Sequence, residues 1–113
     1  MKKENTIFLN HILQSIQYIE EDTKGFTFEK FKSARTIQDA VIRNIEIIGE
    51  AAKNISREFM KEHKELPWRD MVSMRDKLAH SYFGVDLDIV WDVVIKDLPG
   101  LKRKIKALQE LSK

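Results

Sequence analysis

The chain has 113 residues, no cysteine, and 20 basic against 18 acidic side chains. That length predicts a single domain over residues 1–113, and the lack of cysteine excludes disulfides, thiolate metal sites and a cysteine nucleophile. The net charge of +2 neither requires nor excludes a nucleic-acid partner. No apolar run exceeds three residues, so we predict no signal peptide, no membrane span and a cytoplasmic location.

The first predicted helix has apolar residues at three- and four-residue spacing, which places one buried face on Leu9, Ile12, Leu13, Ile16 and Ile19. Asn5 is predicted to cap its N-terminus, and Gly25 to stop it in the left-handed conformation. Residues 27–31 are then expected to form one short turn, anchored on the core by Phe28 and Phe31.

A long second helix is predicted from about residue 33 to about residue 55. Its main apolar stripe is Ile37, Val41, Ile45, Ile48, Ala52 and Ile55. A stripe widened by further apolar residues indicates a central helix or one that faces two partners. Ser56 is expected to start another short helix, and the charged run 61–65 to form a surface connection.

Pro67 is predicted to lie in the first turn of a third helix, with Trp68, Met71, Val72, Leu78 and Ala79 facing inward and Gly84 at its end. Asp86 is expected to cap a fourth helix bearing Leu87, Val90, Trp91, Val94 and Ile95. Residues 97–100 should break or kink it, because they include a proline. A last amphipathic segment would bury Leu101, Ile105, Leu108 and Leu111. Short loops between four or five helices predict an all-α, antiparallel bundle.

Arg75 is the first candidate for chemistry, because it lies on or beside the apolar stripe of the third helix. A buried guanidinium requires an acidic partner or an anionic ligand. An intramolecular ion pair with Glu46 or Glu50 of the second helix is the structural alternative to a functional role.

His80 is the second candidate, with Asp76 one helical turn before it. A carboxylate at that position can hydrogen-bond one imidazole nitrogen and orient the ring as a general base. A satisfied histidine at a helix end is the alternative.

Arg75 and His80 are about 140° apart around an ideal helix and about 7.5 Å apart along it. Their side chains converge only if the helix ends near His80 or a second copy supplies the other half. Tyr82 lies seven residues after Arg75, and its hydroxyl is a hydrogen-bond group and a modification candidate; the alternative is a packed aromatic ring.

Other kinds of site have weaker support. His11, His63 and His80 lie in separate segments, without the spacing of a metal site, and no nucleotide-cradling glycine loop is present. Glu46 and Glu50 share a helix face, but pairing with a nearby cation explains them better than a carboxylate site. The basic residues 102–106 could touch phosphates, although a solvated face is the simpler interpretation.

The pattern Arg75-x4-His80-x-Tyr82 resembles the signature of HEPN-domain proteins, specifically the HepT-like toxins. Residues 66–71, 74–86 and 90–91 are similar to that family's signature stretch, and residues 36–52 resemble its long second helix. The likeness covers essentially the whole chain.

This resemblance implies a HEPN-like homodimer whose two motif helices meet in a cleft, and a metal-independent endoribonuclease that acts as the toxin of a toxin–antitoxin pair. It implies no cofactor. The implied partners are RNA and a minimal nucleotidyltransferase (MNT-type) antitoxin, which would transfer AMP to Tyr82. Arg75 and His80 would be catalytic, and Asp76, where the family often has asparagine, would support their orientation.

In the mechanism that follows from these roles, His80 takes the proton of an RNA 2′-hydroxyl, Arg75 stabilises the phosphorane, and the product carries a 2′,3′-cyclic phosphate. A HEPN module with little or no activity, which binds a nucleotidyltransferase partner, a nucleotide or RNA, is the alternative.

Overall fold

The computed structural model describes residues 2–79 and 86–111, without the side chains at positions 75, 77 and 79. In this part of the chain every regular element is a helix, as predicted: α1 (Lys3–Thr23), α2 (Phe28–Lys32), α3 (Arg35–Lys53), α4 (Arg57–Glu62), α5 (Trp68–Ala79), α6 (Leu87–Asp92), the π-helical segment η1 (Val93–Asp97) and α7 (Leu98–Leu111). None of these helices is long and apolar enough to span a bilayer.

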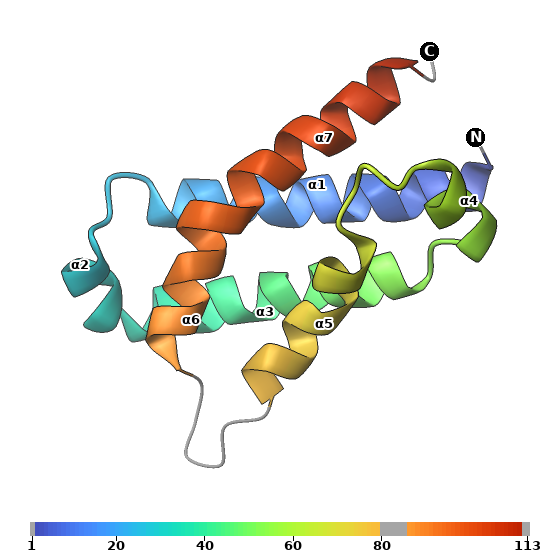
Figure 1. The fold of residues 1–113 in the computed structure, drawn as a ribbon. Coiled ribbons are helices and arrows are strands. Elements are labelled where there is room, and N and C mark those ends of the chain that lie inside the picture. Colours follow the sequence, from blue (N-terminus) through green and yellow to red (C-terminus); the bar gives the residue numbers. More distant parts are fainter. Residues whose placement is uncertain (1, 80–85, 112–113) are drawn as a thin grey trace.

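The bundle is built around α1 and α3, which run antiparallel side by side (Figure 1). Helix α7 returns along α1 in the opposite direction, and two polar contacts join this pair: Lys102 Nζ to Glu20 Oε1 at 2.8 Å and Gln109 Nε2 to Asn10 Oδ1 at 2.7 Å. Helix α5 packs against α3. The predicted antiparallel all-α bundle is therefore confirmed, and α3 is the central helix that its wide apolar stripe indicated.

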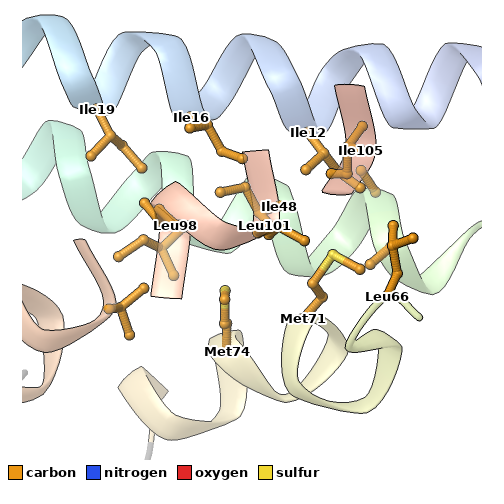
Figure 2. Packing of buried hydrophobic residues seen from close by; sticks show 14 of the residues in the cluster. Ile12, Ile16, Ile19, Ile48, Leu66, Met71, Met74, Leu98, Leu101 and Ile105 are labelled. Carbon is orange, nitrogen blue, oxygen red and sulfur yellow. The ribbon is translucent and has the colours of Figure 1, made fainter. Parts of the chain in front are cut away.

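The core lies where α1, α3, α5 and α7 face one another (Figure 2). Ile12, Ile16 and Ile19 of α1 are fully buried, and Met71 and Met74 point from α5 toward the residues of α3 and α7. A second contact joins α2 to α6, because the buried ring of Phe31 lies 5.0 Å from the ring of Trp91. The apolar periodicity of the sequence thus identified most of the core.

Several predicted helix ends are confirmed. Gly25 has φ of +75°, which is the left-handed conformation. Ser56 Oγ accepts from Phe59 N at 3.2 Å, and Asp86 Oδ1 accepts from Asp88 N at 2.9 Å, so both residues cap helices. Pro67 was predicted in the first turn of the third helix, but it directly precedes α5, and its carbonyl accepts from Met71 N. The predicted helix end at Gly84 lies outside the described residues.

The prediction for Asn5 is wrong, because α1 begins earlier and its N-cap residue is Lys2. Asn5 is only 3% exposed. Its Nδ2 donates to Ser56 Oγ at 3.3 Å, and its Oδ1 accepts from Ser56 N at 3.1 Å. Its side chain therefore holds the start of α4 instead of the start of its own helix.

Two further corrections concern the last third of the chain. Ile95 is 54% exposed and Leu111 is 84% exposed, although both were expected to face inward. Ile95 lies in the wider turn of η1, which directs Val93 and Val94 to the core instead. Two successive three-residue steps, from Ile105 through Leu108 to Leu111, turn the side chain by about 120° around the helix, and this places Leu111 away from the core.

Residues 97–100 do not break the helix. The helical path continues through Pro99, and the direction of the chain changes between α6 and α7 (Figure 1). A proline ring clashes with the preceding turn of an α-helix, and the π-helical turn directly before Pro99 provides the extra room. The kink, rather than the break, is the correct prediction.

Candidate active site on helix α5

Helix α5 is firmly attached to the bundle. Met71, Met74 and Leu78 are at most 5% exposed and form its inner face. At its N-terminus the indole Nε1 of Trp68 donates to the carbonyl oxygen of His63 at 2.8 Å. Burial of three large apolar side chains stabilises the position by several kcal/mol, at about 1.5–3 kcal/mol for each. Any residue on α5 therefore has a well-fixed backbone.

Two of the predicted site residues lie on this helix. Arg75 belongs to α5, directly after Met74 and four residues after Met71, and its backbone is helical. Asp76 is the next residue, and its side chain is exposed to solvent. His80 and Tyr82 lie outside the described residues. The structure thus shows the helix that carries Arg75 and Asp76. The arrangement of the four motif side chains, Arg75, Asp76, His80 and Tyr82, stays a prediction.

The acidic residues of α3 were weighed as partners of nearby cations. Glu46 has such a partner in Arg43, whose Nη1 lies 3.7 Å from Glu46 Oε2. Glu50 is exposed and lines a pocket of about 170 Å³ between α1 and α3, together with His11. The ion pair of Glu46 with Arg43 agrees with the structural interpretation of that glutamate.

The remaining histidines have local roles in the described residues. The His63 ring lies 4.4 Å from the Phe59 ring, and its Nδ1 is 3.3 Å from Glu65 Oε1. In the run 61–65 only His63 is half-buried, so the expectation of a solvated segment is confirmed for the other four residues, although Lys61 and Glu62 belong to α4 and not to a connection. Nowhere in residues 2–79 and 86–111 do three histidine, aspartate or glutamate side chains gather as metal ligands would.

The basic segment 102–106 is divided between two roles. Lys102 makes an ion pair with Glu20 of α1 and so helps to join α7 to the bundle. Arg103, Lys104 and Lys106 are exposed. The expectation of a solvated face is confirmed for these three residues, and Lys104 in addition borders a pocket.

That pocket was missed by the sequence analysis. It has a volume of about 300 Å³ and lies between α5 and the η1–α7 helix; we call it the α5–α7 pocket, and its lining residues are Pro67, Asp70, Met74, Lys96, Asp97, Gly100, Leu101 and Lys104. In the sequence, only the four-residue spacing of Lys96, Gly100 and Lys104 indicated that these lining residues share one helix face. The opposite wall comes from α5 and could not be assigned without the fold.

Comparison with known proteins gives a consistent result. The family model described as "Ribonuclease HepT-like" matches residues 12–108. A Thermococcus cleftensis protein named "Probable ribonuclease HepT" is 47% identical over 97% of this chain and 100% of its own length. A protein of Caldanaerobacter subterraneus named "Putative RNase" is 41% identical over 94% of this chain and 95% of its own length.

A third relative is longer than this chain. It is a Methanocaldococcus jannaschii protein named "Gamma-glutamylcyclotransferase and putative RNase", and it is 52% identical over 100% of this chain but only 51% of its own length. The chain thus spans about half the length of that relative. No solved structure matches the chain significantly. The helical bundle and the match over residues 12–108 together show that the chain belongs to the HepT-like ribonuclease family.

Proposed function

We propose that this chain is a metal-independent endoribonuclease and the toxin of a HEPN/MNT toxin–antitoxin system. The observation that carries the proposal is the family match over residues 12–108, which includes both Arg75 and His80. A full-length relative named as a probable ribonuclease supports it. The family gives the class of reaction, and the roles of individual residues are argued below from chemistry.

RNA carries its own nucleophile in the 2′-hydroxyl. In the proposed reaction His80 takes the proton of this hydroxyl, and the 2′-oxygen forms a bond to the adjacent phosphorus. The bond from phosphorus to the 5′-oxygen breaks, and the 5′-oxygen takes up a proton. The products are a 2′,3′-cyclic phosphate and a 5′-hydroxyl end, and no oxidant or co-substrate is consumed.

Arg75 is assigned to the charge that develops on phosphorus. A guanidinium offers two parallel N–H donors to the non-bridging oxygens, and this bidentate contact strengthens as negative charge grows in the transition state. The attachment of α5 through Met71, Met74 and Leu78 supports this role, because a donor fixed in advance needs no reorganisation during the reaction.

A second copy of the chain is part of the proposal. On a straight helix Arg75 and His80 point about 140° apart, so one copy does not aim both at one phosphate. A two-fold axis beside the motif would bring two copies of each side chain to one groove. The active unit is therefore proposed to be a homodimer.

Asp76 is assigned a positioning role. It lies four residues before His80, and its exposed carboxylate is free to accept from an imidazole N–H if the helix continues that far. Such an acceptor would fix the tautomer that leaves the other ring nitrogen as a base. The same negative charge near a phosphate site favours the second candidate function, a HEPN module that chiefly binds a nucleotidyltransferase partner, a nucleotide or RNA.

Neutralisation is proposed to occur at Tyr82. An MNT-type antitoxin would transfer AMP from ATP: the tyrosine oxygen forms a bond to the α-phosphorus, its proton goes to a base, and pyrophosphate leaves. The added phosphate would occupy Arg75 and obstruct the groove.

The test uses purified full-length protein on labelled RNA in the presence of EDTA. Arg75→Ala should lower the cleavage rate about 10²- to 10³-fold, and His80→Ala about 10²- to 10⁴-fold. Arg57→Ala on α4 and His11→Ala on α1 are matched controls, because both side chains are exposed. RNA left intact by folded wild-type protein would contradict the ribonuclease and support the binding module; activity lost in EDTA would contradict metal independence.

A further inference from the structure

The α5–α7 pocket brings together three kinds of surface that the proposed catalytic residues do not use. Its floor is apolar, because Met74 and Leu101 are at most 4% exposed and Pro67 is half-buried. Its rim carries two ammonium groups and two carboxylates. A volume of about 300 Å³ is at the lower end of the range for small-ligand sites.

The cations of the rim are available to a ligand. The side chain of Lys104 is exposed, and its ammonium group makes no hydrogen bond or ion pair with any described residue. Lys96 Nζ lies 3.4 Å from Asp92 Oδ1, but both side chains are more than 60% exposed, and a pair of this kind contributes little. Gly100 lies between the two lysines, and Arg103 Nη2 would be 3.7 Å from a Cβ at that position. Three cationic side chains, those of Lys96, Arg103 and Lys104, thus surround Gly100, where the helix surface carries no side chain.

The carboxylates restrict what can bind. Asp70 of α5 and Asp97 of η1 line the same pocket, and within residues 2–79 and 86–111 neither carboxylate has a hydrogen-bond or ion-pair partner. Both carboxylates repel a bare phosphate ion. The best occupant therefore combines a negative group for the lysines, hydrogen-bond donors for the aspartates, and a flat apolar face for the floor.

A ribonucleotide unit has all three properties. Its phosphate pairs with ammonium groups, and its ribose 2′-hydroxyl and exocyclic amino groups donate to carboxylates. Its base can lie over the apolar floor that Pro67, Met74 and Leu101 line together. We infer that the α5–α7 pocket is a subsite for one nucleotide of single-stranded RNA, an inference that rests on the proposed function.

The pocket adjoins the proposed catalytic position without including it. Met74 directly precedes Arg75, so the two positions are about 100° apart around α5. Asp70 is five residues before Arg75, about 7.5 Å along the helix. An RNA strand that fills the pocket would pass around the N-terminal half of α5, and the subsite would hold a nucleotide away from the bond that is cut.

The first experiment measures binding of a fluorescein-labelled single-stranded RNA by the full chain with His80→Ala, which keeps the probe intact. Lys104→Gln is compared with Lys106→Gln, because both lysines are exposed on α7 but only Lys104 lines the pocket. Lys104→Gln should weaken binding about 3- to 10-fold and lower the slope of log affinity against log salt by about 0.7. Equal effects of the two substitutions would overturn the inference.

The second experiment separates a nucleotide from a phosphate alone. Asp70→Ala is compared with Asp39→Ala, which removes an exposed carboxylate of α3 that does not line the pocket. Relative to that control, Asp70→Ala should weaken RNA binding and reduce the preference for RNA over DNA of the same sequence. Tighter binding than in the control would mean that the site holds only an anion, and would overturn the nucleotide subsite.

Two outcomes separate this inference from the proposed function. If wild-type protein cleaves RNA but Lys104→Gln and Lys106→Gln bind RNA equally well, the subsite is overturned and the proposed ribonuclease activity stands. Binding that depends on Lys104 without any cleavage by wild-type protein supports the subsite and overturns the ribonuclease. If free AMP binds in the pocket but Lys104→Gln leaves the affinity for RNA unchanged, the RNA subsite is overturned in favour of a site for a free nucleotide.

Discussion

The buried contact between Asn5 and Ser56 should contribute strongly to stability, although it involves only two residues. Asn5→Ala removes both hydrogen bonds, at 3.1 Å and 3.3 Å, and leaves the Ser56 N–H without its partner in a half-buried place. At about 1 kcal/mol for each bond, the free energy of unfolding should fall by about 2 kcal/mol. For a domain of this size that corresponds to a melting temperature lower by about 8 °C.

The matched control is Asn10→Ala in the same helix. Asn10 Oδ1 accepts from Gln109 Nε2 at 2.7 Å, but the contact is exposed, so its loss should cost at most about 0.5 kcal/mol. Both substitutions gain the same helix propensity from alanine, and the difference between them isolates the buried contact.

Chemical denaturation of the two variants and of Ser56→Ala measures this difference. Ser56→Ala should also be destabilising, by about 1 kcal/mol, because Ser56 Oγ caps α4. The double variant Asn5→Ala/Ser56→Ala should lose less than the sum of the single effects, since the two side chains share one contact. An Asn5→Ala variant as stable as Asn10→Ala would refute the reasoning.

Three other predictions concern single positions. Gly25→Ala should lower the free energy of unfolding by about 1–2 kcal/mol, because alanine is strained at φ of +75°. Gly100→Ala should raise it by about 0.4–1 kcal/mol in the same denaturation assay, because Gly100 is helical and its new Cβ would lie 3.7 Å from Arg103 Nη2. Ile105→Ala should cost about 2–5 kcal/mol, since Ile105 is fully buried, and Leu111→Ala less than about 0.5 kcal/mol; similar melting temperatures would contradict the assigned faces. Tyr82→Phe should stop label transfer from radioactive ATP by an MNT-type enzyme, and continued labelling would exclude this tyrosine as the acceptor.

The sequence predicted those features of the fold that depend on local chemistry. Gly25, Ser56 and Asp86 end or cap helices as expected, because turn geometry and capping involve residues a few positions apart. Asn5 has the same capping chemistry, but its partner Ser56 is distant in sequence. Nothing in a local pattern distinguishes a cap from such a tertiary contact.

The candidate site was predictable to a similar degree. The position of Arg75 in a helix anchored by Met71 follows from apolar spacing, and the structure agrees. The α5–α7 pocket was not predictable, because Asp70 and Lys104 belong to helices whose contact is set by the packing of the whole bundle. Residue spacing within one helix can predict the wall of a pocket that this helix forms, but it cannot predict which helix forms the opposite wall.

The π-helical segment has a consequence for how the chain can vary in length. A π-helical turn accommodates one residue more than an α-helical turn between hydrogen-bonded groups. Removal of the exposed Ile95 would let Val93–Asp97 close into ordinary α-helix, but the ring of Pro99 would then clash with the preceding helical turn. A version of the protein that is one residue shorter here would therefore need another residue in place of Pro99 to keep the same interior.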